Sequence, residues 1–471
     1  MTPPGCTTAL LRDAPDEAVD AARPLPGMPA PRDGSGADTA RDSGRTRHVL
    51  VLFGSDWDDE LLHRYAATGR WRFSTEGFDL FRFPSNAQLL WVNIERFVDK
   101  MVRRYRGRID GVISTNEQFG ALAAALVAER LGLPGTPPAH ILLAQHKLAA
   151  RDALRHRFAH LQPPWYLAAP YDIPPAQAER FAYPLFVKPL KATFSVLARE
   201  VHSAQELRAH LRFRPWEKHI IKRLLVPYNQ ALRKLRTHVL DAHHVILESP
   251  MRGLQVNVDG YAWGGERRIL GIADEVMYPG TMSFLRFEAP SRLPADWQAR
   301  IERTALAVMA ELGYTHGFFN LEFFVDPDSG ALKLIEVNPR LAAQLAEFHQ
   351  WLHGIDVYEL GFEMACNAAP PAPASPPARG RYGAAASFVW RAFDAQSCPR
   401  LPSAADLAWL RSNFAHARLK CFPKSGHALR RDLKWLSSHR WALLNMPAAD
   451  AAALRAGYEA ICARLGWPAP Y

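Results

Sequence analysis

Short apolar runs alternate with helical patterns between residues 46 and 140. The run Arg47-His-Val-Leu-Val-Leu-Phe53 predicts a strand that ends at Gly54, and the Ser/Asp cluster behind it is suited to cap a helix. A second run, Gly111-Val-Ile-Ser114, precedes a helical pattern over 119–131. Strands separated by helices predict a parallel α/β layer, so we expect an N-terminal α/β domain over 46–140.

Strands dominate the pattern from residue 141 onward. Branched and aromatic residues predict strands over 184–189, 245–247, 254–258 and 268–272. Apolar residues at helical spacing predict helices over 145–160, 203–213 and 297–312. We therefore expect a second unit, of mixed α and β structure, over 141–365.

Two stretches of the chain carry no apolar periodicity. Residues 1–45 mix Pro, Gly, Ala, Asp and Arg, which predicts a disordered leader. Residues 366–380 are rich in Ala and Pro and predict a semi-rigid linker. The apolar runs beyond the linker, with a helical pattern over 449–465, predict a small C-terminal domain over 381–471.

Composition places the chain among globular proteins. It has 471 residues, 48% of them hydrophobic, and no apolar run approaches the ~20 residues that a membrane helix needs. The N-terminus lacks the apolar segment of a secretory signal. Five cysteines, an odd number without a CxxC pair, argue against a disulfide framework and a structural zinc site. These features predict a protein of the reducing cytoplasm.

The charge balance is basic. A formal net charge of +10 suits an anionic ligand, and the excess is concentrated over 208–236 and 418–440. No RNP, zinc-finger or Gly-rich RNA motif accompanies either stretch. A solvated basic face is therefore favoured over a nucleic-acid partner.

The strongest local pattern lies between His316 and Arg340. Two arms rich in aromatic and branched residues, 317–325 and 331–338, flank the turn sequence Asp326-Pro-Asp-Ser-Gly330. Such arms around turn residues predict a β-hairpin.

Alternation along this hairpin brings polar side chains to one face. If Asp328-Ser329-Gly330 form the loop, Glu322 lies opposite Glu336. Asn320 then lies opposite Asn338, and opposed side chains begin only ~5 Å apart. Two carboxylates that close, on otherwise apolar strands, repel each other and require a cation between them. Carboxylate and amide oxygens suit Mg²⁺, so we predict a metal site here.

A less specific interpretation is a pair of edge-strand carboxylates in water, followed by an ordinary Asn-Pro turn. Arg340 disfavours it, because its planar guanidinium is a clamp for anionic oxygens and stands two residues beyond Asn338.

Glu322, the segment Ile335-Glu336-Val-Asn338-Pro-Arg340 and the upstream lysines resemble the ATP-grasp superfamily. Biotin carboxylase, D-alanine–D-alanine ligase and the L-amino-acid ligases belong to it, and the resemblance covers about residues 49–365. It implies that Glu322, Glu336 and Asn338 hold two Mg²⁺ ions, or Mn²⁺ ions, that bridge the ATP phosphates. It also implies that Arg340 acts in catalysis by steadying the transferred phosphoryl group or the acyl phosphate.

The resemblance extends to the nucleotide side. Lys147 falls where the family has its first ATP lysine, with His146 at a position that is commonly aspartate. Lys188 ends a buried strand and would reach the phosphates as a catalytic point charge. Glu248 matches the hinge region beside the adenine, and Gln255 stands where many members carry a ribose-binding Glu.

The loop after Lys188 departs from the family pattern. It lacks the glycines that let backbone amides cradle phosphate in many relatives, so Lys191 and Ser195 would contact phosphate by side chain. Residues 283–286 follow a flexible Pro-Gly-Thr loop and are candidates to line the acceptor pocket.

The resemblance implies an ATP-dependent ligase of α/β class that forms a carbon–nitrogen bond. ATP would phosphorylate a small-molecule carboxylate, an amine would displace phosphate, and ADP would be the nucleotide product. Alternatives are a biotin-carboxylase-like enzyme, a non-catalytic ATP-binding regulatory protein, and a modifier of acidic macromolecules that uses the basic face. A homodimer is compatible with the sequence.

Overall fold

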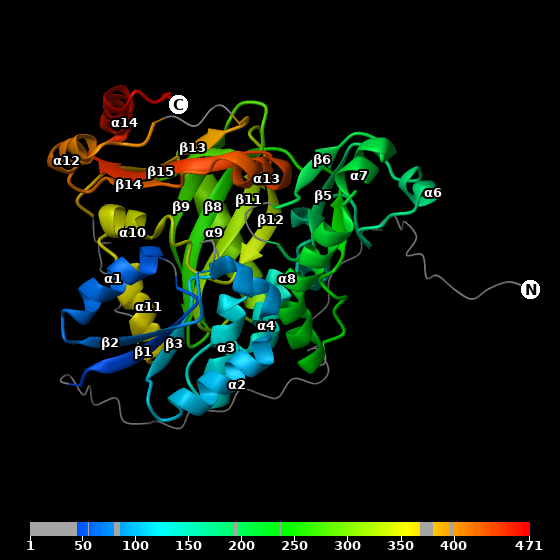
Figure 1. The fold of residues 1–471 in the computed structure, drawn as a ribbon, viewed down its shortest axis with the longest axis horizontal. Coiled ribbons are helices and arrows are strands. Elements are labelled where there is room, and N and C mark those ends of the chain that lie inside the picture. Colours follow the sequence, from blue (N-terminus) through cyan, green and yellow to red (C-terminus); the bar gives the residue numbers. More distant parts are fainter. Residues whose placement is uncertain are drawn as a thin grey trace, which may run out of the picture. The chain divides into compact units, whose positions relative to one another are not determined.

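The computed structural model describes most of the chain from residue 45 to the end. The described ranges are 45–54, 56–79, 85–192, 196–235, 237–367, 380–395 and 400–471. Nearly all of the predicted leader and linker lie outside these ranges. Residues 46–471 form one compact unit, and its strands lie in three sheets (Figure 1).

A three-stranded parallel sheet begins the described chain. Its order is β2 (Trp71–Glu76), β1 (Arg47–Leu52), β3 (Gly111–Ile113), which confirms the parallel layer predicted for this part. The helices that belong to it are α1 (Asp56–Ala66), η1 (Ser85–Trp91), α2 (Ile94–Tyr105), α3 (Gly120–Leu131) and α4 (Pro138–Gln145). Strand β2 was not predicted, because its sequence Trp-Arg-Phe-Ser-Thr-Glu is largely polar and only its first residue is buried.

A four-stranded antiparallel sheet follows in the chain. Its order is β4 (Tyr166–Ala169), β7 (Val245–Glu248), β5 (Leu185–Pro189), β6 (Arg199–Val201). The helices of this part are α5 (Lys147–Leu154), η2 (Ala159–Leu161), α6 (Pro175–Ala178), α7 (Ala204–His210) and α8 (Pro215–Lys234). The helix predicted over 145–160 is thus confined to α5.

The start of α5 is set by His146. Its backbone is extended, at φ −94° and ψ 104°, and its imidazole accepts from the Ala149 N–H at 3.2 Å. An extended residue with such a side-chain acceptor ends one helix and caps the next. Lys147 therefore stands at the first position of α5.

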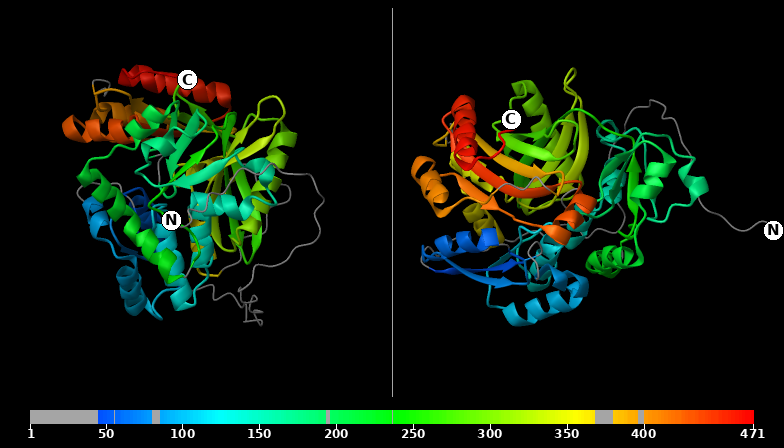
Figure 2. Two further views of the ribbon diagram at one scale, coloured as in Figure 1. Left: turned by 90° about the vertical axis from the view of Figure 1, so that its right-hand side faces the viewer. Right: turned by 45° about the horizontal axis from the view of Figure 1, so that its top comes forward.

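An eight-stranded antiparallel sheet forms the centre of the unit (Figure 2). Its order is β12 (Leu332–Asn338), β11 (Gly317–Val325), β8 (Leu254–Trp263), β9 (Glu266–Met277), β10 (Phe284–Ala289), β13 (Ala384–Ala392), β15 (His439–Ala448), β14 (Arg418–Cys421). Helix α9 (Ala295–Glu311) covers one face, where Ile301 and Val308 join a core cluster with Phe319 and Leu321. Helix α10 (Ala346–His353) covers the other face, and α11 (Val357–Ala365) follows it.

The strands after residue 380 extend this central sheet. Strand β13 pairs with β10, and β15 and β14 follow. The remaining helices are α12 (Ala404–Asn413), α13 (Gly426–Leu436) and α14 (Ala451–Leu465). Between α14 and the strands lies a separate apolar cluster that includes Trp390, Tyr458 and Ile461.

Two further findings bear on the predictions from composition. None of the helices in the described ranges is long and apolar enough to cross a membrane. Cys421 and Cys462 are free thiols, and two further cysteines, Cys6 and Cys398, lie outside the described residues.

Candidate functional site

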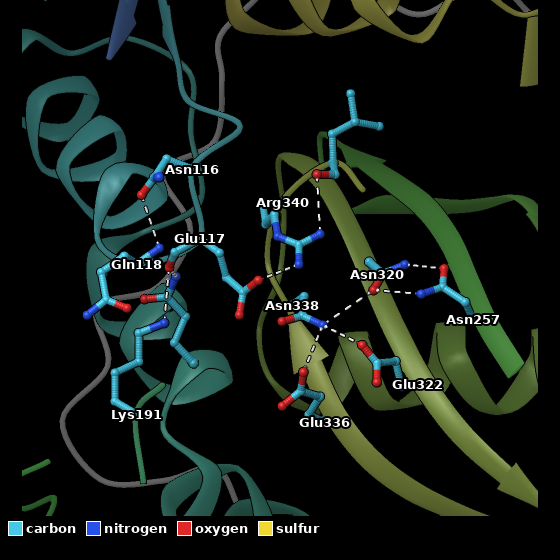
Figure 3. A network of polar contacts seen from close by, with 12 residues as sticks. Asn116, Glu117, Gln118, Lys191, Asn257, Asn320, Glu322, Glu336, Asn338 and Arg340 are labelled. Atoms are coloured by element: carbon cyan, nitrogen blue, oxygen red, sulfur yellow. Dashed lines mark hydrogen bonds and ion pairs between the residues drawn. The ribbon is translucent and has the colours of Figure 1, made fainter. Parts of the chain in front are cut away.

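The hairpin of β11 and β12 carries the predicted metal ligands. Its register places Glu322 opposite Glu336 and Asn320 opposite Asn338, as alternation along the two arms predicts. Asn338 Nδ2 lies 3.5 Å from Glu322 Oε1 and 3.5 Å from Glu336 Oε1. These side chains meet on one face of the sheet (Figure 3).

The loop of this hairpin is longer than predicted. The Asp326 N–H donates to the Ala331 carbonyl at 2.8 Å, so four residues, 327–330, form the loop instead of 328–330. A bulge at Ile335 compensates for the extra residue and restores the predicted pairing of the two glutamates. The register was predicted correctly, but the loop length behind it was wrong.

Asn320 anchors the hairpin to the neighbouring strand β8. Its Nδ2 donates to Asp259 Oδ1 at 2.7 Å and to Asn257 Oδ1, and its Oδ1 accepts from Asn338 Nδ2 at 3.3 Å. On the far side, Asp259 Oδ2 lies 3.0 Å from His349 Nε2 of α10. This buried network fixes Asn320, which in turn orients Asn338.

Three carboxylates crowd this face of the sheet. Burial, together with Glu275 of β9 and Glu336, raises the pKa of Glu322 well above its usual range. Burial also raises the pKa of Glu275. Burial acts in the same direction on Glu336, but Lys147 Nζ, 2.9 Å from Oε2, outweighs it and lowers the pKa of Glu336. Without a cation beside them, Glu322 and Glu275 therefore hold their protons more strongly than ordinary carboxyl groups do, whereas Lys147 favours the ionised form of Glu336.

The opposite wall carries the predicted phosphate lysines. Lys188 Nζ lies 2.8 Å from Glu248 Oε2, and Arg151, one turn after Lys147 on α5, pairs with the other oxygen of that carboxylate. Burial opposes the ionisation of Glu248, yet these two cations lower its pKa. Burial lowers the pKa of Lys188 even though Glu248 is beside it. Glu248, 1% exposed, is thus neutralised within the protein.

Arg340 faces the loop between β3 and α3. Its guanidinium forms an ion pair with Glu117, and Lys191 Nζ donates to the Glu117 backbone carbonyl at 3.0 Å (Figure 3). Burial lowers the pKa of Lys191 to about 8, with partial compensation from Glu117. The first part of the chain thereby contributes a loop to the site.

A cleft between the two walls brings most of the predicted residues together. It encloses about 890 Å³ of empty space, part of it open to solvent. The predicted residues that line the cleft are Lys147, Lys188, Glu248, Gln255, Glu322 and Glu336. Lys191 and Asn338 line an adjoining cavity that shares Lys147 and Glu336, whereas Arg340 lines a third cavity against α3 and α11. Apolar side chains such as Phe186, Met251, Met277 and Phe324 complete the cleft.

The other predicted residues are Ser195 and the candidate acceptor segment 283–286. Ser195 lies outside the described residues. In the candidate acceptor segment, Phe284 lines the cleft, and Ser283 Oγ lies 2.8 Å from Ser438 Oγ. Arg286 is buried and pairs with Glu288 at 2.7 Å, so its charge is already neutralised.

Several residues of the site were missed from the sequence. Arg151 stands four positions after Lys147, a helical spacing that places both on one face and was available as a signal. Glu275 lies beyond the predicted end of its strand, because β9 continues to Met277 instead of ending at Ile272. Glu117 belongs to a loop whose position next to Arg340 no local pattern indicates.

The donor set fits a hard divalent cation that shares its shell with phosphate. Among the described residues, no group of three or more His, Cys, Asp or Glu side chains is arranged to hold a metal ion by itself. Two carboxylates and an amide leave several positions of an octahedral shell for phosphate and water. Asn338 presents Nδ2 to the carboxylates, so its amide has to turn over for Oδ1 to become a ligand.

Comparisons with known proteins agree with this geometry. The family model of the ATP-grasp domain matches residues 181–348. Carnosine synthase 1 of Gallus gallus is 28% identical over 301 residues, which are 59% of this chain and 30% of that protein. A D-alanine–D-alanine ligase of Chlorobaculum parvum is 30% identical over 184 residues, which are 37% of this chain and 43% of that enzyme. The chain thus spans less than half the length of these curated relatives.

Solved structures extend the likeness in fold to most of the chain. An L-amino acid ligase from Bacillus licheniformis superposes with a TM-score of 0.65 at 17% identity, over 89% of this chain and 98% of that one. A biotin carboxylase from Campylobacter jejuni gives a TM-score of 0.58 at 14% identity, over 90% and 92%. The predicted α/β class and the resemblance drawn from the hairpin are confirmed.

Proposed function

We propose that this chain, whose residues 181–348 form an ATP-grasp domain, is an ATP-dependent ligase. It would activate a small-molecule carboxylate as an acyl phosphate and join it to an amine, with ADP and phosphate as products. The curated relatives are named a carnosine synthase and a D-alanine–D-alanine ligase, and part of each aligns with this chain.

The opposition of charge across one cleft carries this proposal. Glu322 and Glu336 line the cleft from the eight-stranded sheet, and Lys147 and Lys188 line it from α5 and β5. An apolar surface completes it. A nucleoside triphosphate with a divalent cation has the complementary pattern of apolar base, anionic phosphates and cationic metal.

Residues on both walls of the cleft are positioned to contact a nucleotide. Lys147, Lys188 and Lys191 would hold the phosphates, and Gln255 would reach the ribose. Both oxygens of Glu248 are engaged by cations, so we assign it the role of orienting Lys188 beside the adenine region. The phosphate contact of Ser195 stays a prediction.

Mg²⁺, with Mn²⁺ as an alternative, fits the acidic wall. Glu322, Glu336 and Asn338 would hold two ions. When bound, the metal neutralises phosphate charge and orients the γ-phosphate. The convergence of these three side chains on one face of the hairpin is the observation that supports such a role.

Two bond exchanges make up the reaction. A donor carboxylate oxygen attacks the γ-phosphorus, and the bond from that phosphorus to the ADP oxygen breaks. The lone pair of the amine then attacks the acyl carbon, phosphate leaves with the electrons of the C–O bond, and the nitrogen gives up a proton. Arg340 would balance the charge of the acyl phosphate, while the lysines and the walls position the reactants.

Two rivals use the same fold. A biotin-carboxylase-like enzyme would need bicarbonate as the carboxylate, and likeness in fold alone supports it. A regulatory ATP-binding protein without turnover would not need Glu322 and Glu336 as metal ligands for catalysis. The retained acidic wall, with Arg340 nearby, favours catalysis.

Phosphate release from ATP tests the proposal. The full chain is incubated with ATP, Mg²⁺ and pools of amino acids and other small acids and amines. We expect release that depends on an added carboxylate and an amine, and that disappears in Glu336→Gln but persists in the exposed control Glu459→Gln. Release that depends on bicarbonate would favour the carboxylase rival. ATP binding without stimulated release would contradict the ligase.

A further inference from the structure

Two half-buried arginines on the C-terminal strands differ from the buried arginines among the described residues. Arg151 and Arg286 pair with carboxylates, whereas Arg391 of β13 and Arg440 of β15 have none within ion-pair distance in the described ranges. Arg391 and Arg440 are also direct cross-strand partners. Like charges directly opposite each other destabilise a sheet.

The contacts of this arginine pair are all to neutral groups. Arg391 Nε donates to the Phe284 carbonyl at 3.1 Å, and its Nη1 donates to Ser438 Oγ at 3.0 Å. Arg440 Nη1 lies 3.5 Å from Gln344 Oε1, and its guanidinium lies 4.7 Å from the centre of the Phe422 ring. Each guanidinium has five N–H donors, so several remain for a ligand.

Burial makes the arrangement costly. It lowers the pKa of Arg440 to about 10, and burial together with Arg440 lowers the pKa of Arg391 to about 10. Both side chains still carry their charge at pH 7. Two half-buried cations without a counter-charge require an anion from outside, by the same reasoning that applies to the carboxylates of the acidic wall.

The location of the pair connects it to the cleft. Phe284, whose carbonyl binds Arg391, lines the cleft. Gln344, which Arg440 contacts, stands four residues after Arg340. The arginine pair therefore contacts both the rim of the cleft and the loop that follows Arg340.

We propose that Arg391 and Arg440 bind a compact oxyanion, a carboxylate or a phosphate monoester, carried by the amine substrate. This inference rests on the proposed ligase function. Planar guanidinium forks match such groups in pairs of parallel hydrogen bonds. With its anion held there, the acceptor presents its amine toward the acyl phosphate, and neutral amines are selected against.

Binding without turnover tests the inference directly. Glycine is compared with glycinamide, and O-phosphoethanolamine with ethanolamine, by ligand-detected NMR on the full chain with Mg²⁺ and ADP present. We expect the acidic member of one pair to bind the wild type, and to lose about 10- to 100-fold in affinity in the double variant Arg391→Gln/Arg440→Gln. Which acidic amine binds distinguishes a carboxylate from a phosphate.

Arg455→Gln, a change at an exposed ion pair of α14, is the matched control and should bind like the wild type. Thermal unfolding without ligand shows whether the double variant folds. We expect its Tm to equal or exceed that of the wild type, because two like charges are removed. Equal binding of acidic and neutral amines, or unchanged binding by the double variant, would overturn the inference.

Turnover separates this site from the nucleotide site. In Arg391→Gln we expect the KM for the acidic amine to rise by about 10- to 100-fold, with the KM for ATP unchanged. Arg391→Lys keeps the positive charge but loses the planar guanidinium, so its KM for the acidic amine should lie between those of the wild type and Arg391→Gln. If the wild type shows no ligase turnover, the proposed function fails while the NMR comparison still decides whether the pair binds an acidic amine. An unchanged KM in Arg391→Gln would contradict the inference.

Discussion

Glu248 and Glu322 line the same cleft, but their pKa values are shifted in opposite directions. Glu248, on the four-stranded sheet, binds Arg151 and Lys188, and these cations lower its pKa. Glu322, on the eight-stranded sheet, faces Glu275 and Glu336, and its pKa is raised. Protein cations favour the ionised form of Glu248, whereas burial and neighbouring carboxylates favour the protonated form of Glu322.

This difference separates a carboxylate that the protein pairs internally from one that we propose binds a ligand. A buried pair whose charges cancel holds its members in place, as Glu248 holds Lys188. A buried group whose charge is not cancelled costs stability unless a ligand supplies the opposite charge. Variants of the two glutamates and of their neighbours test whether the two walls of the cleft differ in this way.

The largest effect is expected from Glu322→Gln. The change keeps the shape of the side chain but removes a proposed metal ligand, so ATP turnover should fall about 10³-fold, or about 4 kcal/mol in the barrier. Stability should stay equal or rise, because repulsion within the acidic wall decreases. Steady-state phosphate release and thermal unfolding measure the two. Retained turnover, or a large loss of stability, would place Glu322 in the structural class.

Glu248→Gln is expected to show the opposite pattern. It leaves Arg151 and Lys188 buried without their counter-charge, and should lower the free energy of unfolding by about 3 kcal/mol. Urea denaturation followed by circular dichroism measures the loss. Glu459→Gln, at an exposed pair with Arg455, serves as control and should change it by less than about 1 kcal/mol. A loss no larger than the control's would show that Glu248 does not hold the cationic wall.

Asn320→Ala probes the support behind the acidic wall. Asn320 touches the proposed ligand Asn338 but is not one itself, so the Mg²⁺ concentration for half-maximal turnover should rise about 10- to 100-fold. Activity should recover at high Mg²⁺. If high Mg²⁺ fails to restore turnover, or the requirement for Mg²⁺ is unchanged, Asn320 does not act through Asn338.

Lys191 differs from both glutamates, because its Nζ donates to a backbone carbonyl and not to a carboxylate. The pH dependence of stability that it contributes is the smallest of the expected effects. Its pKa is about 8 in the folded chain against an ordinary value of 10.5. Between these values the unfolded state binds more protons than the folded state, so the free energy of unfolding should rise with pH. Urea denaturation at about pH 8 and about pH 10 compares the wild type with Lys191→Met, which should lose this increase. If the free energy of unfolding depends on pH equally in the wild type and in Lys191→Met, the lowered pKa of Lys191 is contradicted.

Local pattern predicted the hairpin well. Alternation and the polar identities of Glu322, Glu336, Asn320 and Asn338 are properties of two short segments, and a single bulge absorbed the error in loop length. The helix predicted over 145–160 is found only over Lys147–Leu154, because the extended His146 ends the preceding helix and caps this one. Such features need few contacts beyond their own segments.

Contacts between distant segments were not predicted. Nothing near Glu248 in the sequence indicates that Arg151, 97 positions earlier, neutralises it. Glu117 reaches Arg340 across 223 positions, and Arg391 faces Arg440 only because β13 and β15 are neighbours. The charges that distinguish the two walls therefore became visible only with the tertiary structure.

The continuity of the eight-stranded sheet has a practical consequence for handling the protein. Strand β10 is an inner strand because β13 covers its outer side. A chain shortened to end before Ala384 would turn β10 into an edge strand, with a row of unpaired backbone N–H and C=O groups. Such an edge recruits strands from other molecules. Trimming the protein toward residues 181–348 should therefore yield aggregates instead of a smaller folded domain.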